Sequence, residues 1–138
     1  MADQLKVRLV TPERILVDQA AESVEIPAKN GSIDVLYGHA PLIAEIGAGE
    51  VRLHGGEAGN QRYAVARGFV EVLPDRVTIL AESAQKPEEI DTAAVREQLQ
   101  HGQQLWNEAG EDAEKYKHAN EVIAEAEAKL TSGGEKSS

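Results

Sequence analysis

The chain has 138 residues, of which 41% are hydrophobic and 28% charged, and this is enough for one domain with an appendage or for two small domains. Its formal charge of −10 argues against binding to nucleic acid, which needs lysine and arginine to neutralise phosphates, and against direct contact with anionic lipid. It has no cysteine, which excludes disulfide bonds and thiolate metal sites. We expect neither a secretory signal nor direct membrane insertion, since no apolar run approaches the roughly 18 residues that cross a bilayer.

The first part of the chain alternates apolar and polar residues in short runs. Leu5, Val7 and Leu9 are the first apolar set, with Lys6 and Arg8 between them. Similar runs continue to the segment "RVTILAE", and turns containing glycine or proline separate them about every 8–12 residues. This period of two predicts an N-terminal antiparallel β-sandwich of about ten short strands, within a domain spanning residues 1–85.

After the last of these runs the period changes to that of a helix. Asp91 and Asp112 are placed to cap two helices. The apolar positions recur at steps of three and four in each helix, first at Val95, Leu99, Gly102 and Trp106, then at Tyr116, Ala119, Ile123, Ala126 and Leu130. We therefore predict an antiparallel two-helix hairpin over residues 86–131 and a disordered tail over residues 132–138.

The hairpin should dock on another surface, because each helix has a narrow, alanine-rich apolar face. That surface is either the sandwich of the same chain or another subunit. The polar segment "ESAQKPEEI" before the first helix can act as a hinge. Two interpretations stay open: a hairpin fixed to the sheet, or a mobile hairpin with a regulatory role.

The sequence contains no recognisable catalytic, metal-binding or cofactor-binding motif. Its four histidines lack metal-ligand spacing, and no nucleophile elbow or phosphate-binding loop is present. His39 lies between Gly38 and Pro41, two residues that restrict a turn, which favours a structural or interface role over catalysis. The alternative is a freestanding β-sandwich binding or enzymatic domain with a site at His39.

The segment "NGSIDVLYGHAPLIAEIGAGEVRL", residues 30–53, carries a family resemblance. It is similar to the segment in which bacterial F-type ATP synthase epsilon subunits have the pattern G-H-A-P-L followed by a glycine turn and a strand. The segments "GFVEVLPDRVTILAESA" and "EEIDTAAVREQL" resemble the last sandwich strands and the start of the helical hairpin in that family. The resemblance runs in order from about Leu5 to Leu130.

This resemblance implies a non-catalytic central-stalk (rotor) subunit of the proton-translocating F-type ATP synthase. Such a subunit couples rotation of the gamma subunit to the ring of c subunits, and its hairpin can regulate ATP hydrolysis by contacting the beta subunit. The implied location is the cytoplasmic face of the bacterial inner membrane, as a peripheral membrane protein.

Two sets of residues match functional positions of the family. The expected interface with gamma comprises Gly38, His39, Ala40, Pro41 and Leu42. The loop expected to face the c ring comprises Asn30, Gly31 and Ser32. The chain departs from the family pattern nearby, with Asp34 at a usual glycine, Tyr37 at a usual proline, and Ala66 and Arg67 before Gly68.

The hairpin matches the family's two regulatory features only in part. Ile90 and Asp91 match the first half of an ATP-binding motif, but Ala94 stands at its arginine position and the second helix has no arginine. No cofactor is therefore expected. The resemblance also implies that the extended hairpin inhibits rotation by meeting an acidic loop of the beta subunit, where basic residues help. Residues 88–130 contain eleven acidic and four basic residues, so we expect weak inhibition at most.

Overall fold

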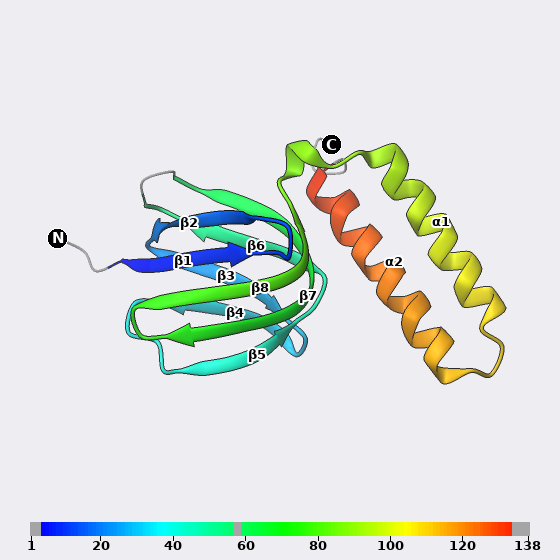
Figure 1. Cartoon of the computed structure of the whole chain (residues 1–138), viewed down its shortest axis with the longest axis horizontal. Coiled ribbons are helices and arrows are strands. Elements are labelled where there is room, and N and C mark those ends of the chain that lie inside the picture. The colour runs from blue at the N-terminus through cyan, green and yellow to red at the C-terminus, as the bar shows by residue number, and fades with distance from the viewer. Residues whose placement is uncertain (1–3, 57–58, 134–138) are drawn as a thin grey trace.

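The computed structural model describes residues 4–56 and 59–133, which form a β-sandwich with two helices beside it (Figure 1). The strands are β1 (Leu5–Val10), β2 (Ile15–Ala21), β3 (Ser23–Ala28), β4 (Gly31–Leu36), β5 (Leu42–Ile46), β6 (Gly49–His54), β7 (Gln61–Leu73) and β8 (Arg76–Gln85). The single-turn helix η1 (Pro87–Glu89) leads to α1 (Thr92–Glu108) and α2 (Ala113–Gly133).

One long strand, β7, joins the two layers of the sandwich. Its first half pairs with β6 and its second half with β5, while β8 runs along most of its length. The strands β2, β1 and β8 extend one layer, and β3 and β4 extend the other beyond β6. The change of partner occurs at Ala66–Gly68, where the Gly68 φ of 141° allows a bend and a Cβ atom would meet the Leu80 carbonyl oxygen at 1.9 Å.

The alternating runs bury one side of each strand. Leu5, Val7 and Leu9 are fully buried, whereas Lys6 and Arg8 between them are exposed. The main hydrophobic core consists of sandwich residues from Leu5 to Ala84, with no residue of the described helices. The helices therefore pack on a sandwich that has a core of its own.

The predicted sandwich is confirmed, with two differences in detail. The described residues form eight strands rather than about ten, because the runs "RYAVA" and "GFVEVL" belong to the single strand β7. Within the described residues, the strand pairs are antiparallel except β1 with β8, which run parallel. The whole sandwich separates these two strands in the sequence, so the chain has ample length for a parallel pairing.

The two-helix hairpin is also present, and its caps are the predicted ones. The Asp91 Oδ1 atom accepts hydrogen bonds from the Ala93 and Ala94 amides at 3.1 and 3.2 Å, and Asp112 caps α2 in the same way. The helix α2 ends at Gly133, two residues beyond the expected end at 131. Residues 134–138 of the expected tail lie outside the described residues.

Helix α2 makes the main contact with the sandwich, and α1 lies on its outer side (Figure 1). The side chain of Glu125 on α2 is buried at this junction, and Ala119 and Ala126 have no exposed surface. Between the two helices, the rings of Trp106 on α1 and Tyr116 on α2 meet edge to face, with centroids 5.4 Å apart. No described helix is long and apolar enough to cross a membrane.

Candidate interaction surfaces

The turn between β4 and β5 contains the residues expected to face gamma. The Gly38 φ of 91° is left-handed, and its amide donates to the Pro74 carbonyl oxygen at 2.7 Å, which ties the turn to the one between β7 and β8. The His39 Nδ1 atom lies 2.7 Å from the carbonyl oxygen of Ala40. A carbonyl oxygen can only accept, so Nδ1 is the donor in this contact, and the ring holds the shape of its own turn.

The loop expected to face the c ring is the tight turn between β3 and β4. Asn30, Gly31 and Ser32 are exposed, and Gly31 has a φ of 126°. This turn lies at the start of β4 and the His39 turn follows its end. At six residues, β4 is about 20 Å long. The structure thus does not bring the two predicted surfaces together at one end of the sandwich.

A groove between the β3–β4 turn and β5 nevertheless links parts of the two surfaces. Its volume is about 660 Å³, and its lining includes Asn30, Gly31 and Ser32 on one side and Leu42 and Ile43 on the other. Leu42 is therefore the one member of the expected gamma set that shares a groove with the expected c-ring loop.

The sequence analysis missed an exposed row of apolar side chains that crosses four strands. We name this the apolar row: Ile15 on β2, Val10 on β1, Leu80 on β8 and Phe69 on β7, which are successive partners in the strand register. Ile15, Leu80 and Phe69 are 52, 54 and 53% exposed, whereas large apolar side chains are most often buried. Ile43, at 71% exposed, lies diagonally opposite Phe69.

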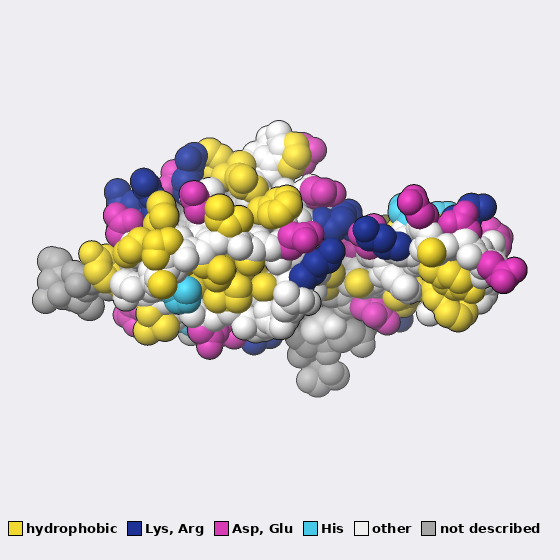
Figure 2. Space-filling view, turned by 90° about the horizontal axis from the view of Figure 1, so that it is seen from below, with side chains coloured by type: hydrophobic (Ala, Val, Ile, Leu, Met, Phe, Trp, Pro, Cys, Tyr) yellow, Lys and Arg dark blue, Asp and Glu magenta, His cyan; other side chains and the backbone are white. Residues whose placement is uncertain are grey.

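A signal for the apolar row does exist in the sequence. In β7 and β8 the strict alternation is broken by the adjacent pairs Phe69–Val70 and Ile79–Leu80. One member of each pair must face outward, because successive side chains of a strand point to opposite faces. Figure 2 shows hydrophobic side chains spread over the face of the sandwich that it presents. Such a continuous apolar surface is typical of a protein–protein interface.

The two residues of the ATP-binding motif have structural roles here. Asp91 caps α1, and Ile90 follows η1 with its amide donating to the Pro87 carbonyl oxygen at 3.3 Å. Among the described residues, no three histidine, aspartate or glutamate side chains are placed to hold a metal ion.

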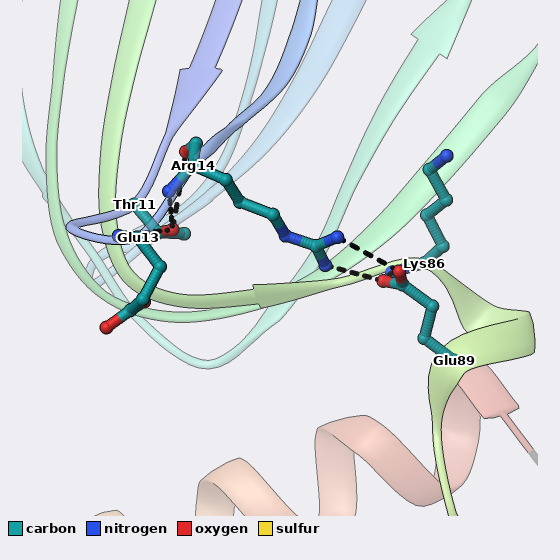
Figure 3. A network of polar contacts seen from close by, with 5 residues as sticks. All are labelled: Thr11, Glu13, Arg14, Lys86 and Glu89. Carbon is teal, nitrogen blue, oxygen red and sulfur yellow. Dashed lines mark hydrogen bonds and ion pairs between the residues drawn. The ribbon is translucent and has the colours of Figure 1, made fainter.

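The connector before the hairpin is fastened to the sandwich by one arginine (Figure 3). Arg14, in the turn between β1 and β2, donates to both carboxylate oxygens of Glu89 at 3.0 and 2.7 Å. The Lys86 amide donates to the same carboxylate at 2.9 Å. These hydrogen bonds favour the ionised form, and they lower the pKa of Glu89 from 4.5 to about 2.

Comparison with known proteins identifies the family. Residues 4–87 match the model of the "ATP synthase, Delta/Epsilon chain, beta-sandwich domain". The ATP synthase epsilon chain of Koribacter versatilis is 46% identical over 111 residues, which cover 80% of this chain and 77% of that one. The chain belongs to the ATP synthase epsilon-chain family. The epsilon chain of Rhodospirillum rubrum is 36% identical over 91% of this chain and 95% of its own length.

The solved structures agree on the fold. A chain in the cryo-EM structure of the Euglena gracilis mitochondrial ATP synthase, which contains OSCP, F1 and the c-ring, superposes with a TM-score of 0.76. It is 19% identical, and the match covers 93% of this chain and 80% of that one. Epsilon chains are structural and regulatory subunits rather than catalytic ones, so the alternative of a freestanding domain with a site at His39 is not favoured.

Proposed function

We propose that this epsilon-family chain is a rotor subunit that binds gamma through the apolar row and residues 38–42 and faces the c ring with the loop at Asn30–Ser32. It works as a peripheral subunit at the cytoplasmic face of the bacterial inner membrane. The observation that carries this proposal is the apolar row, an exposed apolar surface on a sheet with a well-packed core. Gamma is the partner that the family membership suggests for such a surface.

The rigidity of the sheet suits a subunit that transmits torque. The apolar row is formed by neighbouring strands whose opposite faces lie in one core, so its side chains cannot shift relative to one another without disturbing that core. The turn at Gly38 is fixed by its hydrogen bond to Pro74. A partner that docks on these elements would push against a preformed surface rather than a flexible loop.

The loop at Asn30–Ser32 is a suitable contact for the polar loops of a c ring. It is short, exposed and polar. Glycine adopts the positive φ found at Gly31 with little strain. The groove beside it includes Leu42, so one partner seated there could touch both elements.

The hairpin is proposed to be the regulatory part and to contact beta weakly. The acidic loop of beta that the family resemblance implies would repel the acidic excess of residues 88–130 within the Debye length, which is about 8 Å at physiological salt. The compact arrangement, with α2 on the sandwich, is therefore favoured.

The proposal is tested by replacing one member of the apolar row. Leu80→Ser should weaken binding to purified gamma by about 10- to 100-fold, because a buried leucine side chain contributes about 1.5–3 kcal/mol to an interface. The melting temperature of the free chain should change little, since Leu80 is 54% exposed. Affinity is measured by calorimetry and folding by circular dichroism.

Arg76→Ser is the matched control. Arg76 is an exposed polar residue on the same strand as Leu80, and it lies outside the apolar row. Its replacement should leave gamma affinity within about twofold. Equal affinities of the Leu80 variant and the unmodified chain would reject the apolar row as the gamma-binding surface.

A further inference from the structure

A chain of ion pairs fastens α2 to the sandwich. Arg67 on β7 lies between two carboxylates, with its Nε atom 3.0 Å from Glu82 Oε1 on β8 and its Nη2 atom 2.9 Å from Glu125 Oε1 on α2. The second oxygen of Glu125 is 3.1 Å from the Lys129 ammonium. Figure 2 shows basic side chains gathered where the hairpin meets the sandwich. Arg67 thus joins the sandwich to α2.

The two carboxylates around Arg67 differ in how far their charge depends on the arginine for stabilisation. The Glu82 side chain is 65% exposed, so water can replace its arginine. Glu125 is only 8% exposed, and a buried carboxylate is stable only when paired and hydrogen-bonded. Burial raises the pKa of Glu125, but Lys129 and Arg67 outweigh that effect and keep the pKa below 4.5. Without Arg67, docking of α2 would bury a carboxylate held by Lys129 alone.

The backbone of Arg67 adds an independent observation. Its φ of 53° is left-handed, and among the described residues it is the only non-glycine with a positive φ. It stands at the corner where β7 passes from β6 to β5, and Gly68 follows it with another positive φ. Glycine adopts this conformation more easily than any residue with a Cβ atom. The sandwich alone would therefore be served better by glycine at this position.

We propose that Arg67 is a latch that holds the helical hairpin against the sandwich at the expense of backbone strain within the sandwich. The two effects have opposite signs in one residue. Replacement by glycine should relieve the strain in β7 and release α2. If Arg67 served only to stabilise the sandwich, its replacement by glycine would destabilise the sandwich and leave α2 docked.

The contacts of the connector indicate where a released hairpin would pivot. Arg14 holds Glu89, so the chain up to η1 stays on the sandwich when the Arg67 contact is lost. The next residue, Ile90, is extended and precedes the cap of α1 at Asp91. The hairpin should therefore swing as one body about Ile90, with the packing between α1 and α2 intact.

The experiment measures the separation of the two parts in the full chain. The chain has no cysteine, so Asp34→Cys on β4 and Asn107→Cys on α1, both at exposed positions, can carry two spin labels without background. Electron–electron double resonance should show one narrow distance distribution in the otherwise unmodified chain. In Arg67→Gly the undocked population, seen as a broad and longer component, should rise relative to the docked one by about tenfold or more.

The same variant should keep its sandwich folded. Hydrogen exchange at β7 and β8 should be as slow as in the unmodified chain or slower, while amides of α2 should show unchanged protection because the hairpin keeps its own hydrogen bonds. Loss of protection in β7 and β8 would overturn the latch and make Arg67 a residue that the sandwich needs. An unchanged distance distribution would also overturn it, because apolar packing alone would then hold α2.

Two further variants separate charge from other causes. In the Arg67→Gly background, Glu125→Gln removes the buried charge and should restore most of the docked population. Arg14→Gln removes another arginine–glutamate pair between distant segments, yet it leaves the Arg67 contacts untouched and should leave the distance distribution unchanged. Equal release by Arg14→Gln, or failure of Glu125→Gln to restore docking, would contradict the latch.

Discussion

At the scale of single residues, two arginines divide the work of joining the sandwich to the hairpin. Arg14 binds the connector and Arg67 binds α2, and each does so through a glutamate far away in the sequence. Their settings differ, because Glu89 is a third exposed whereas Glu125 is buried. The exposed pair holds the connector but contributes little to the free energy of folding. Loss of either partner of the buried pair should cost much more, because it leaves a buried charge unpaired.

The Arg14 pair makes a prediction about pH. In the unmodified chain the Glu89 carboxyl should titrate at about pH 2, and in Arg14→Gln the pKa should rise toward 4.5. Because the folded-state pKa is depressed, the ionised carboxylate stabilises the fold above about pH 4.5, and that contribution is lost as the pH falls toward 2. The carboxyl carbon shift in NMR, followed against pH, measures this pKa.

Glu13→Gln is the control for this titration, since Glu13 lies beside Arg14 in the sequence but its amide donates to the Thr11 hydroxyl oxygen and its side chain is not a partner of Glu89 in the described contacts. It should leave the Glu89 midpoint in place. A Glu89 midpoint near 4.5 in the unmodified chain would mean that the Arg14 bond does not persist in solution.

At the scale of elements, the hairpin depends on one close contact between its helices. Gly102 of α1 is buried, and a Cβ atom there would lie 2.8 Å from Ile123 Cγ1 and 3.0 Å from Val122 Cγ1. Glycine is unfavourable inside a helix by about 1 kcal/mol relative to alanine. Its presence indicates that the close approach of α1 and α2 outweighs that propensity.

Gly102→Leu should therefore destabilise the hairpin by about 1–3 kcal/mol, because the added side chain forces the helices apart. The single tryptophan, Trp106, lies against Tyr116 of the other helix, so its fluorescence during urea unfolding reports on this contact. Gln103→Leu adds a similar side chain at the next, exposed position and should change stability by less than about 0.5 kcal/mol. Equal midpoints for the two variants would show that the helices can separate without loss.

At the scale of the whole molecule, the sandwich and the hairpin are two unequal parts. The sandwich contains the entire main core, while the hairpin relies on the contact between its helices and on one side of α2. A part with its own core can fold alone. We therefore expect the domain boundary predicted at residue 85, where β8 ends, to be a boundary of independent folding.

A chain shortened after Lys86 should unfold in one cooperative transition and still bind gamma. Removing α2 exposes surface on β6 and β7 but takes no residue from the main core. Calorimetry and gamma affinity measure the two properties. A chain shortened after Leu80 loses the buried Ala81 and Ala84 and should not fold cooperatively. Absence of a transition in the longer fragment would make the hairpin part of the folding unit.

Much of the fold was predictable because its signals are local. The alternation at Leu5, Val7 and Leu9 predicts a strand with one buried face, and Asp91 and Asp112 mark the two helix starts by their capping chemistry. Each signal depends on neighbours within a few residues. The family resemblance around His39 likewise depends on a continuous segment, and it led to the correct family.

The sequence by itself determined the period of every element, the absence of a recognisable catalytic motif and the family. Only the tertiary structure decided which residues from distant segments meet. The pairing of β1 with β8, the alignment of Ile15, Val10, Leu80 and Phe69 into one row, and the bond from Arg67 to Glu125 all depend on register and packing between elements. The physical reason is that such contacts join residues far apart in the sequence, about seventy positions for Val10 and Leu80. The local sequence pattern around one residue does not identify such a distant partner.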